Sequence, residues 1–232
     1  MAAAVVEHEF AQRAALADAL ASAVAADLRE AIDARHVAVL ALSGGTTPAL
    51  FLRRLAAQDL DWHGVVVTLV DERWVPPTHE RSNARLVMEN LLQGSVAGAR
   101  FVPLYAPAPD PEHALDRVAQ RVGDLPRPFD AVVLGLGLDG HTASWFPGGD
   151  RLDDALDPRG AALVLSMRAP AAGEPRMTLT LAPLAAARHL YLHIEGAEKR
   201  ALFRRIVDGA AASPLRALLD NTEATLQVYC SA

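Results

Sequence analysis

Short apolar runs alternate with helical segments along most of this chain, and that alternation constrains the fold more than any other feature of the sequence. The strand-like runs cover residues 36–42, 65–70, 101–104, 129–136 and 188–194. The segments with helical patterns cover residues 10–34, 47–57, 83–93, 112–122 and 197–208. Strands that are apolar throughout, separated by helices, are typical of parallel sheets covered on both faces. The sequence therefore predicts an α/β sandwich with a mostly parallel central sheet.

The chain has 232 residues, a length that suits one large domain or two small ones. Hydrophobic residues make up 51% of it, which is enough for a sizeable core. The proline-rich segment 105–111 (YAPAPDP) has the composition of a linker, but a helix and a strand follow at once. We therefore expect a loop at this segment and a single domain over residues 1–232.

Charge and composition exclude several classes of partner. The formal net charge of -6 argues against general affinity for nucleic acid, because phosphate-backbone binding needs a basic face. The sequence contains neither a basic N-terminal region before an apolar segment nor 18 consecutive apolar residues, so we expect no membrane association. The single cysteine, Cys230, cannot form an internal disulfide and favours a reducing compartment. We expect a cytoplasmic protein whose positive charges, if its ligand is anionic, are local.

Polar or glycine-rich loops follow three of the strand-like runs. They are residues 43–48 (SGGTTP), 71–74 (DERW) and 135–148 (GLGLDGHTASWFPG). In open α/β sheets, ligands bind outside the carboxyl ends of the strands. We therefore expect these three loops to border one site.

The first loop has the features of an anion site. Two residues without Cβ separate the strand from the helix that follows, so backbone amides can approach an anion. The P-loop lysine is absent, which indicates a single phosphate or carboxylate rather than a nucleoside triphosphate. A compatible alternative is a tight turn in which Thr46 or Thr47 caps the helix and Pro48 lies in its first turn. The candidate anion-binding residues are Ser43, Gly44, Gly45 and Thr46.

The third loop contains Gly135, Gly137 and Gly140 in the spacing G-x-G-x-x-G, which raises the question of a dinucleotide site. That fingerprint requires a helix opening at the last glycine and an acid at the end of a later strand. Pro147 interrupts any long helix starting at Gly140, and the strand candidate 161–167 (AALVLSM) carries no acid at its end. We therefore reject a nucleotide site and look for another role for this loop.

Two pairs of charged or titratable residues share a spacing of two. Asp71 and Arg73 would point the same way on a persisting strand, either as a surface ion pair or as an acid and a cation lining a cleft. Asp139 and His141 lie in the glycine-rich loop. A histidine near a carboxylate at a strand end is a candidate general base.

Five segments together resemble the 6-phosphogluconolactonase family and, more distantly, its sister family, the glucosamine-6-phosphate deaminases. They are 42–48 (LSGGTTP), 70–86 (VDERWVPPTHERSNARL), 134–148 (LGLGLDGHTASWFPG), 175–180 (PRMTLT) and 195–203 (EGAEKRALF). The resemblance implies a three-layer α/β/α fold of the deaminase and ribose-5-phosphate isomerase type. It also implies a carboxylic ester hydrolase that converts 6-phosphoglucono-δ-lactone to 6-phosphogluconate, the second step of the oxidative pentose phosphate pathway.

Residues in two of these segments separate the sister activities. The deaminases usually have tyrosine where this chain has Arg73, and N-E-P-G where it has Trp145 to Gly148, so Phe146 replaces their loop glutamate. Arg73 instead supplies a cation for a reaction that builds negative charge on a carbonyl oxygen. Trp145, in place of a commoner leucine, is a minor departure from the lactonase pattern. A deaminase-like aldose-ketose isomerase and a non-catalytic sugar-phosphate sensor remain the alternative functions.

The resemblance implies a role for each candidate residue. His141 takes a proton from the attacking water, Asp139 or Asp71 orients its ring, and Arg73 stabilises the oxyanion. The phosphate lies on the amides of the first loop and is neutralised by two cations, while two further side chains contact sugar hydroxyls or position a loop. The cations are Arg176 and Lys199, and the two further residues are Ser82 and Asn83.

We expect no metal and no cofactor, and a phosphorylated sugar lactone as the small-molecule partner. The remaining histidines lack the spacing with acids or cysteines that zinc sites show; they are His8, His36, His63, His79, His113, His189 and His193. The sequence leaves the oligomeric state open, and a monomer is compatible with it.

Overall fold

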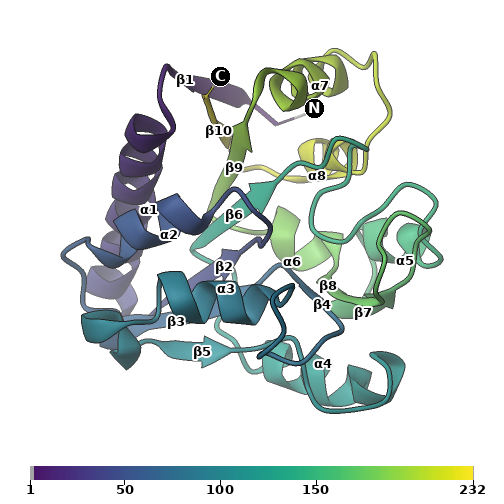
Figure 1. Ribbon diagram of the computed structural model, residues 1–232, viewed down its shortest axis with the longest axis horizontal. Helices are drawn as coiled ribbons and strands as arrows, with labels where there is room; N and C mark the ends of the chain where they lie inside the picture. Colours follow the sequence, from purple (N-terminus) through teal and green to yellow (C-terminus); the bar gives the residue numbers. More distant parts are fainter. Residues whose placement is uncertain (1–2, 232) are drawn as a thin grey trace.

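The computed structural model describes residues 3–231 as two β-sheets with helices packed around them (Figure 1). The strands are β1 (Val5–Phe10), β2 (Ala38–Leu42), β3 (Val65–Leu69), β4 (Asp71–Arg73), β5 (Arg100–Val102), β6 (Ala131–Gly135), β7 (Val164–Met167), β8 (Arg176–Leu179), β9 (His189–Glu195) and β10 (Leu226–Ser231). The α-helices are α1 (Arg13–Arg35), α2 (Ala49–Ala56), α3 (Asn83–Asn90), α4 (Leu115–Gly123), α5 (Leu152–Leu156), α6 (Leu181–Ala185), α7 (Ala197–Val207) and α8 (Leu215–Asn221). Short 3-10 helices cover Trp62–Gly64, Gly94–Gly98 and Glu112–Ala114.

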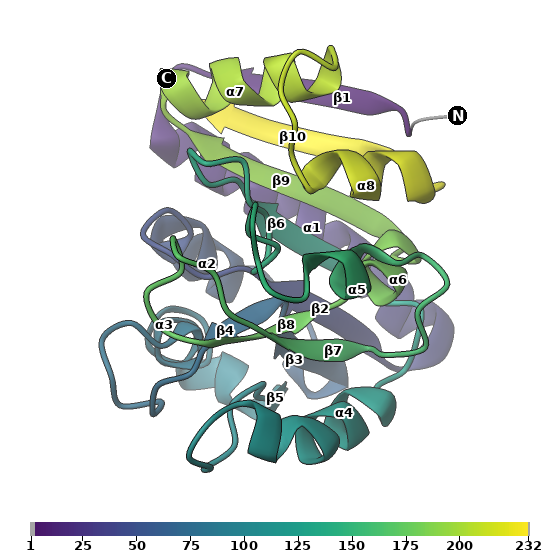
Figure 2. The same ribbon diagram turned by 90° about the vertical axis from the view of Figure 1, so that its right-hand side faces the viewer.

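The larger sheet has seven strands in the order β1-β10-β9-β6-β2-β3-β5, and every neighbouring pair is parallel. Helices α1 and α2 cover one face, and α7 and α8 lie on the other (Figures 1 and 2). Strands β2 and β3 are buried along their whole length, as their uninterrupted apolar runs predicted. The parallel sheet and its helical layers confirm the predicted fold class.

Helix α1 buries Leu16, Leu20, Val24 and Leu28, so the series at a spacing of four does form its sheet-facing side. The helix begins at Arg13 rather than at the predicted residue 10. Residues 5–10 form strand β1 instead, which pairs with β10 from the far end of the chain. Neither strand was predicted, because this pairing joins segments that are distant in the sequence and no local pattern reports it.

The second sheet is small and was not predicted. Strands β4, β8 and β7 pair antiparallel, in that order. Val70 joins this sheet to the parallel one, because its amide donates to Leu42 of β2 and its carbonyl accepts from Leu179 of β8. The strands have only three or four residues each, too few for period-two alternation to be recognised. This sheet matters for function because Asp71 and Arg73 lie on β4 and Arg176 begins β8.

Strands β6, β2 and β3 lie side by side in the large sheet. Because they are parallel, their carboxyl ends meet at the same edge, and the loops that leave them are neighbours there. The three polar loops expected to border one site therefore start from adjacent strands.

Candidate active site

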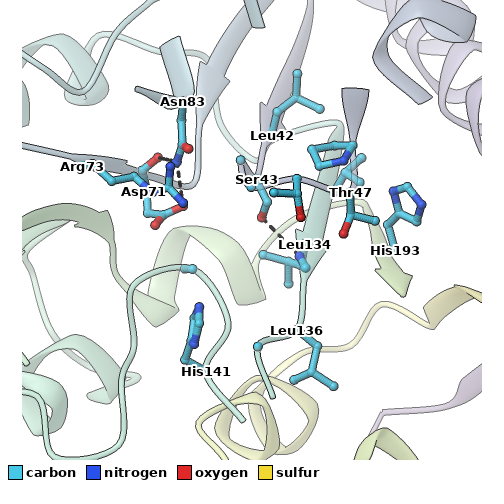
Figure 3. Close-up of a pocket in the computed structure, with 18 of the residues that line it drawn as sticks. Leu42, Ser43, Thr47, Asp71, Arg73, Asn83, Leu134, Leu136, His141 and His193 are labelled. Carbon is cyan, nitrogen blue, oxygen red and sulfur yellow. Dashed lines mark hydrogen bonds between the residues drawn. The ribbon is translucent and has the colours of Figure 1, made fainter. Parts of the chain in front are cut away.

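A cavity of about 350 Å³ opens where these three loops meet (Figure 3). Its wall includes residues 43–48 of the first loop and residues 135–137 of the third. The charged or titratable side chains in the wall are Asp71, Arg73, Arg81, His141, Arg176, His193 and Lys199. The convergence of backbone amides, cations and a histidine in one concave site is typical of an enzyme that binds a small anionic substrate.

His141 pairs with Asp139, its neighbour in the glycine-rich loop. The Nδ1 atom of His141 lies 2.5 Å from Oδ1 of Asp139, and the same oxygen accepts a 3.2 Å bond from the backbone amide of His141. The carboxylate therefore fixes the ring and the tautomer, because it accepts a hydrogen from Nδ1. Nε2 is left as the nitrogen available to water or substrate. Of the two aspartates that the sequence offered as partners of His141, Asp139 is the one in contact.

Gly137 makes room for this pair. A Cβ atom at this position would lie 2.3 Å from the ring of His141 and 2.5 Å from the carboxylate of Asp139. The loop also folds on itself, because the amide of Gly137 donates to the carbonyl of His141 over 2.9 Å. After β6 the next α-helix starts only at Leu152. The glycine-rich loop therefore does not open directly into a helix, as a dinucleotide fingerprint would require.

Asp71 lines the cavity but is held by other groups. Its Oδ2 accepts a 2.5 Å bond from the Ser144 hydroxyl, and its backbone carbonyl accepts a 2.8 Å bond from the Asn83 side chain. Asp71 and Arg73 are both part of the cavity wall, which is one of the two alternatives that the strand spacing left open, and no ion pair joins them within residues 3–231. Ser144 was not among the predicted residues, although it follows His141 by three positions in the same loop.

Glu72 is a buried carboxylate that sequence analysis missed. It faces away from the cavity, where Oε1 accepts from the amides of Arg73 and Asn83 and Oε2 accepts from the amide of Ala84 and the hydroxyl of Ser82. Burial raises the pKa of Glu72, and the bonds from the Asn83, Ala84 and Arg73 amides oppose that shift. Period-two alternation between Asp71 and Arg73 would have placed Glu72 on the buried side, where a carboxylate needs donors.

Ser82 and Asn83 occupy different positions around this carboxylate. Ser82 is buried at the start of α3, where its hydroxyl accepts from the amide of Arg85 and caps the helix. Asn83 reaches the cavity wall. Its side chain packs so closely on Gly44 that a Cβ there would lie 1.8 Å from Asn83 Oδ1. Gly44 is therefore also required by the packing of the first loop against α3.

The first loop presents its backbone to the cavity. The Ser43 hydroxyl accepts a 3.2 Å bond from the Gly135 amide and so joins the first loop to the third. Helix α2 begins at Ala49 after Pro48, and no side chain caps it. The prediction that Thr46 or Thr47 caps this helix was wrong, since Pro48 itself already has helical dihedral angles at the boundary.

The cationic side chains gather at two ends of the cavity. Figure 3 shows Asp71 and Arg73 on one side and Thr47 and His193 on the other. At the first end, which we call the small-sheet end, Arg176 is buried beside Asp71 and Arg73. Burial lowers the pKa of its guanidinium, the charge of Asp71 opposes this shift and the charge of Arg73 adds to it. At the other, the α7 end, Lys199 lies in the first turn of α7. The expected phosphate ligands Arg176 and Lys199 thus share the cavity but have different neighbours.

At the α7 end, His193 of strand β9 forms a second histidine–carboxylate pair. Its Nε2 lies 3.2 Å from Oε1 of Glu195, and Oε2 of Glu195 forms an ion pair with Nε of Arg13 at 3.0 Å. The hydrogen bond from His193 holds the pKa of Glu195 below its ordinary value. No pattern in the sequence predicted this pair, since His193 lies inside an apolar strand.

Phe146 joins the small-sheet end to the histidine. Its ring centroid lies 4.3 Å from that of His141 at an interplanar angle of 33°, and the guanidinium carbon of Arg176 lies 5.3 Å from the Phe146 centroid. The position where the sister family usually has glutamate is therefore held by a buried aromatic ring in contact with both His141 and Arg176.

Residues 3–231 contain neither a candidate metal cluster nor a candidate membrane-spanning helix. No cluster of three or more histidine, cysteine or acidic side chains in this range could hold a metal ion. None of the helices described for it combines the length and the hydropathy needed to cross a membrane.

Comparisons with known proteins place this geometry in context. Residues 11–227 match the model of a family described as glucosamine-6-phosphate isomerases/6-phosphogluconolactonase. The chain is 50% identical over 224 residues to a 6-phosphogluconolactonase of Rhizobium meliloti, a match that covers 96% of this chain and 97% of that protein. It is 45% identical over 202 residues to one of Pseudomonas aeruginosa, covering 86% and 85%. A crystal structure of a 6-phosphogluconolactonase from Shewanella baltica has a TM-score of 0.94 at 39% identity, covering 98% of both chains.

Proposed function

The chain belongs to the family of glucosamine-6-phosphate isomerases and 6-phosphogluconolactonases, and on this basis we propose that it hydrolyses 6-phosphoglucono-δ-lactone to 6-phosphogluconate. The enzyme is a lactone hydrolase, as the high identity to 6-phosphogluconolactonases over nearly their full length shows. The place that we propose for it is the second step of the oxidative pentose phosphate pathway. The observation that carries the proposal is the His141–Asp139 pair, set in a cavity with cations at two ends.

In the proposed mechanism, His141 is the general base. Nε2 takes a proton from a water molecule as the water oxygen forms a bond to C1 of the lactone. The carbonyl electron pair moves to O1 and forms a tetrahedral oxyanion. When the intermediate collapses, the bond between C1 and the ring oxygen breaks, and the imidazolium returns its proton to that oxygen. The product acid then loses a proton to solvent and becomes the carboxylate.

Asp139 is a positioning residue in this scheme. Its contact with Nδ1 orients the ring and stabilises the imidazolium that forms during the attack. Arg73 is our candidate for stabilising the oxyanion, because a cation in the cavity wall can act on charge that develops only in the transition state. Asp71, held by Ser144 and Asn83, fixes the strand that carries Arg73.

The substrate phosphate is assigned to the α7 end. Residues 43–46 line the cavity together with Lys199. The amide of Ser43 donates to the carbonyl of Val133 over 2.9 Å, so the amides of Gly44, Gly45 and Thr46 are our candidate phosphate donors. Charge-assisted bonds to the phosphate would hold C1 within reach of His141. Asn83 lies at the small-sheet end, where its side chain donates to Asp71, and it is our candidate for contacting sugar hydroxyls. Ser82 positions the α3 segment through Glu72.

A lactonase assay tests the proposal. The protein should remove freshly made 6-phosphogluconolactone faster than spontaneous hydrolysis, and His141→Ala should lower kcat by about 10²- to 10⁴-fold. The chain offers a matched control, because His113 pairs with Asp110 at 2.6 Å in the same way but lies exposed outside the cavity wall. His113→Ala should keep full activity. A fully active His141→Ala variant would rule out the mechanism.

The sister activity is tested in the same preparation. Glucosamine 6-phosphate should release no ammonia above background, because Phe146 fills the position of the deaminase glutamate. Tight binding of the lactone's phosphorylated product without any turnover of the lactone would favour the non-catalytic sensor.

A further inference from the structure

Arg73 and Arg176 are direct cross-strand partners. Strands β4 and β8 pair antiparallel, with Arg73 opposite Arg176. Directly opposite residues of an antiparallel pair have their side chains on the same face, and like charges in this position are destabilising. Both side chains line the cavity. The guanidinium of Arg73 donates to the carbonyl of Arg81 over 2.5 Å, and its charge adds to the lowering of the Arg176 pKa. Two cations on the same face of a strand pair in the cavity wall favour an anion at this end of the cavity.

Arg176 is poorly satisfied within the protein. It is 6% exposed, and burial lowers the pKa of its guanidinium, an effect that the carboxylate of Asp71 opposes. Its Nη2 donates 2.7 Å to the carbonyl of Ala172, and its Nε is buried without a hydrogen-bond partner among residues 3–231. No carboxylate of that range lies within ion-pair distance of it. Keeping a cation desolvated and unpaired costs stability, which an anionic ligand would offset.

The position of Arg176 identifies the part of the substrate that it meets. Phe146 lies against both Arg176 and His141, at 5.3 Å from the guanidinium carbon and 4.3 Å from the imidazole centroid. The guanidinium is thus one aromatic ring away from the proposed base. Lys199, by contrast, lies near Glu195, the partner of His193 at the α7 end, and its charge helps to lower the pKa of that carboxylate.

We propose that Arg176 binds the oxygen atoms of C1 together with Arg73, and that the phosphate is held at the α7 end without it. This assignment rests on the proposed lactonase function and revises the expectation that Arg176 and Lys199 share the phosphate. As water adds to C1, O1 becomes the oxyanion and accepts hydrogen bonds from the guanidinium groups. After the ring oxygen leaves with the proton from His141, O1 and the former water oxygen form the carboxylate. A planar guanidinium suits both species, because its donors match two adjacent oxygens.

The assignment predicts that two simple anions occupy different ends of the cavity. D-Gluconate has the product's carboxylate without the phosphate, so the binding of gluconate should depend on Arg176. Inorganic phosphate should depend on Lys199. Unphosphorylated gluconolactone should respond to changes at Arg176 but not to changes at Lys199.

The experiment compares Arg176→Met, Arg176→Lys and Lys199→Met with the unaltered protein. Kinetics with 6-phosphogluconolactone and unphosphorylated gluconolactone are combined with calorimetric titration of D-gluconate and inorganic phosphate. We expect Arg176→Met to lower kcat with both lactones by about 10²- to 10³-fold, to lose gluconate binding and to keep phosphate binding. Lys199→Met should raise KM for the phosphorylated lactone by at least tenfold and lose phosphate binding. Its rate of hydrolysis of unphosphorylated gluconolactone should equal that of the unaltered protein.

The outcomes separate the two proposals. If Arg176→Met loses phosphate binding and still hydrolyses unphosphorylated gluconolactone at the original rate, the Arg176 assignment is overturned. It is equally overturned if the unaltered protein does not bind gluconate. Failure of the unaltered protein to hydrolyse either lactone would refute the proposed function, while the two titrations would still decide where Arg176 acts. Arg176→Lys keeps the buried charge and so separates the effect of the charge from that of the planar guanidinium. The ratio of the rates with the two lactones does not depend on the fraction of protein that is folded, so it separates a change in specificity from a loss of folding.

Discussion

The Nδ1 atom of His141 lies 2.5 Å from Oδ1 of Asp139, two residues earlier in the loop that follows β6. The pair is local in sequence, yet its geometry depends on Gly137, which leaves space for both side chains. The loop therefore contains the proposed base, the carboxylate in contact with it and the small residue that accommodates both.

Asp139→Asn should lower kcat while leaving KM and the melting temperature close to those of the unaltered protein. An amide cannot stabilise the imidazolium as a carboxylate does, and it does not favour the tautomer with hydrogen on Nδ1. We expect a loss of about 10²-fold or more, within the range for a general base. Steady-state kinetics provides the measurement. Asp110→Asn, which alters the exposed His113 pair, is the matched control and should be silent.

Gly137→Ala should abolish most activity without unfolding the chain. The new Cβ would lie 2.3 Å from the ring of His141, so the imidazole must move away from Asp139. A misplacement of about 1 Å can cost about 10²-fold in rate. Gly123→Ala is the control, because a Cβ at Gly123 meets no atom within 4 Å. Equal activity of the two alanine variants would show that the pair does not need the space at Gly137.

Glu72→Gln should destabilise the protein and change how its stability depends on pH. Glutamine offers one acceptor oxygen where Glu72 has two, so buried donors lose a partner at a cost of about 1–3 kcal/mol. Urea titration at neutral pH checks this value.

The pH dependence of the same variant has a defined sign. Because burial raises the pKa of folded Glu72 above its ordinary value of 4.5, the folded state binds more protons than the unfolded state in the window above that value. The contribution of Glu72 to stability is therefore fully present below pH 4.5 and falls as the pH rises through the folded-state pKa. The stability difference between the unaltered protein and Glu72→Gln should shrink over this window. A difference that grows with pH would contradict the raised pKa.

Phe146→Glu should reduce lactonase activity without creating a deaminase. A carboxylate at this position would pair with Arg176 and compete with the anionic substrate for that guanidinium. The substitution would also remove the ring that lies against His141. We expect kcat to fall by at least about 10²-fold, the scale of losing one oxyanion donor. Phe146→Leu keeps an apolar side chain and should lose less. Release of ammonia from glucosamine 6-phosphate by Phe146→Glu would show that this residue alone separates the sister activities.

Much of the architecture could be predicted because buried parallel strands have a local signature. Strands β2, β3 and β6 are continuous apolar runs, and α1 has its buried residues at a spacing of four. The small sheet and the β1–β10 pair escaped prediction, although β7 lies within the strand candidate 161–167. Strands of three or four residues have no measurable period, and pairing between the two ends of the chain leaves no local trace.

The sequence by itself determined the fold class, the three loops at the carboxyl ends of adjacent strands, and the residue types that converge there. These features depend on periodicity and on short spacings, which can be read along the chain. Only the tertiary structure decided that Asp139 rather than Asp71 holds His141, that Glu72 ties β4 to α3, and that Arg176 lies opposite Arg73 and one ring away from the base. Those relationships join residues from different elements, and their distances are set by strand pairing and side-chain packing rather than by separation in the sequence.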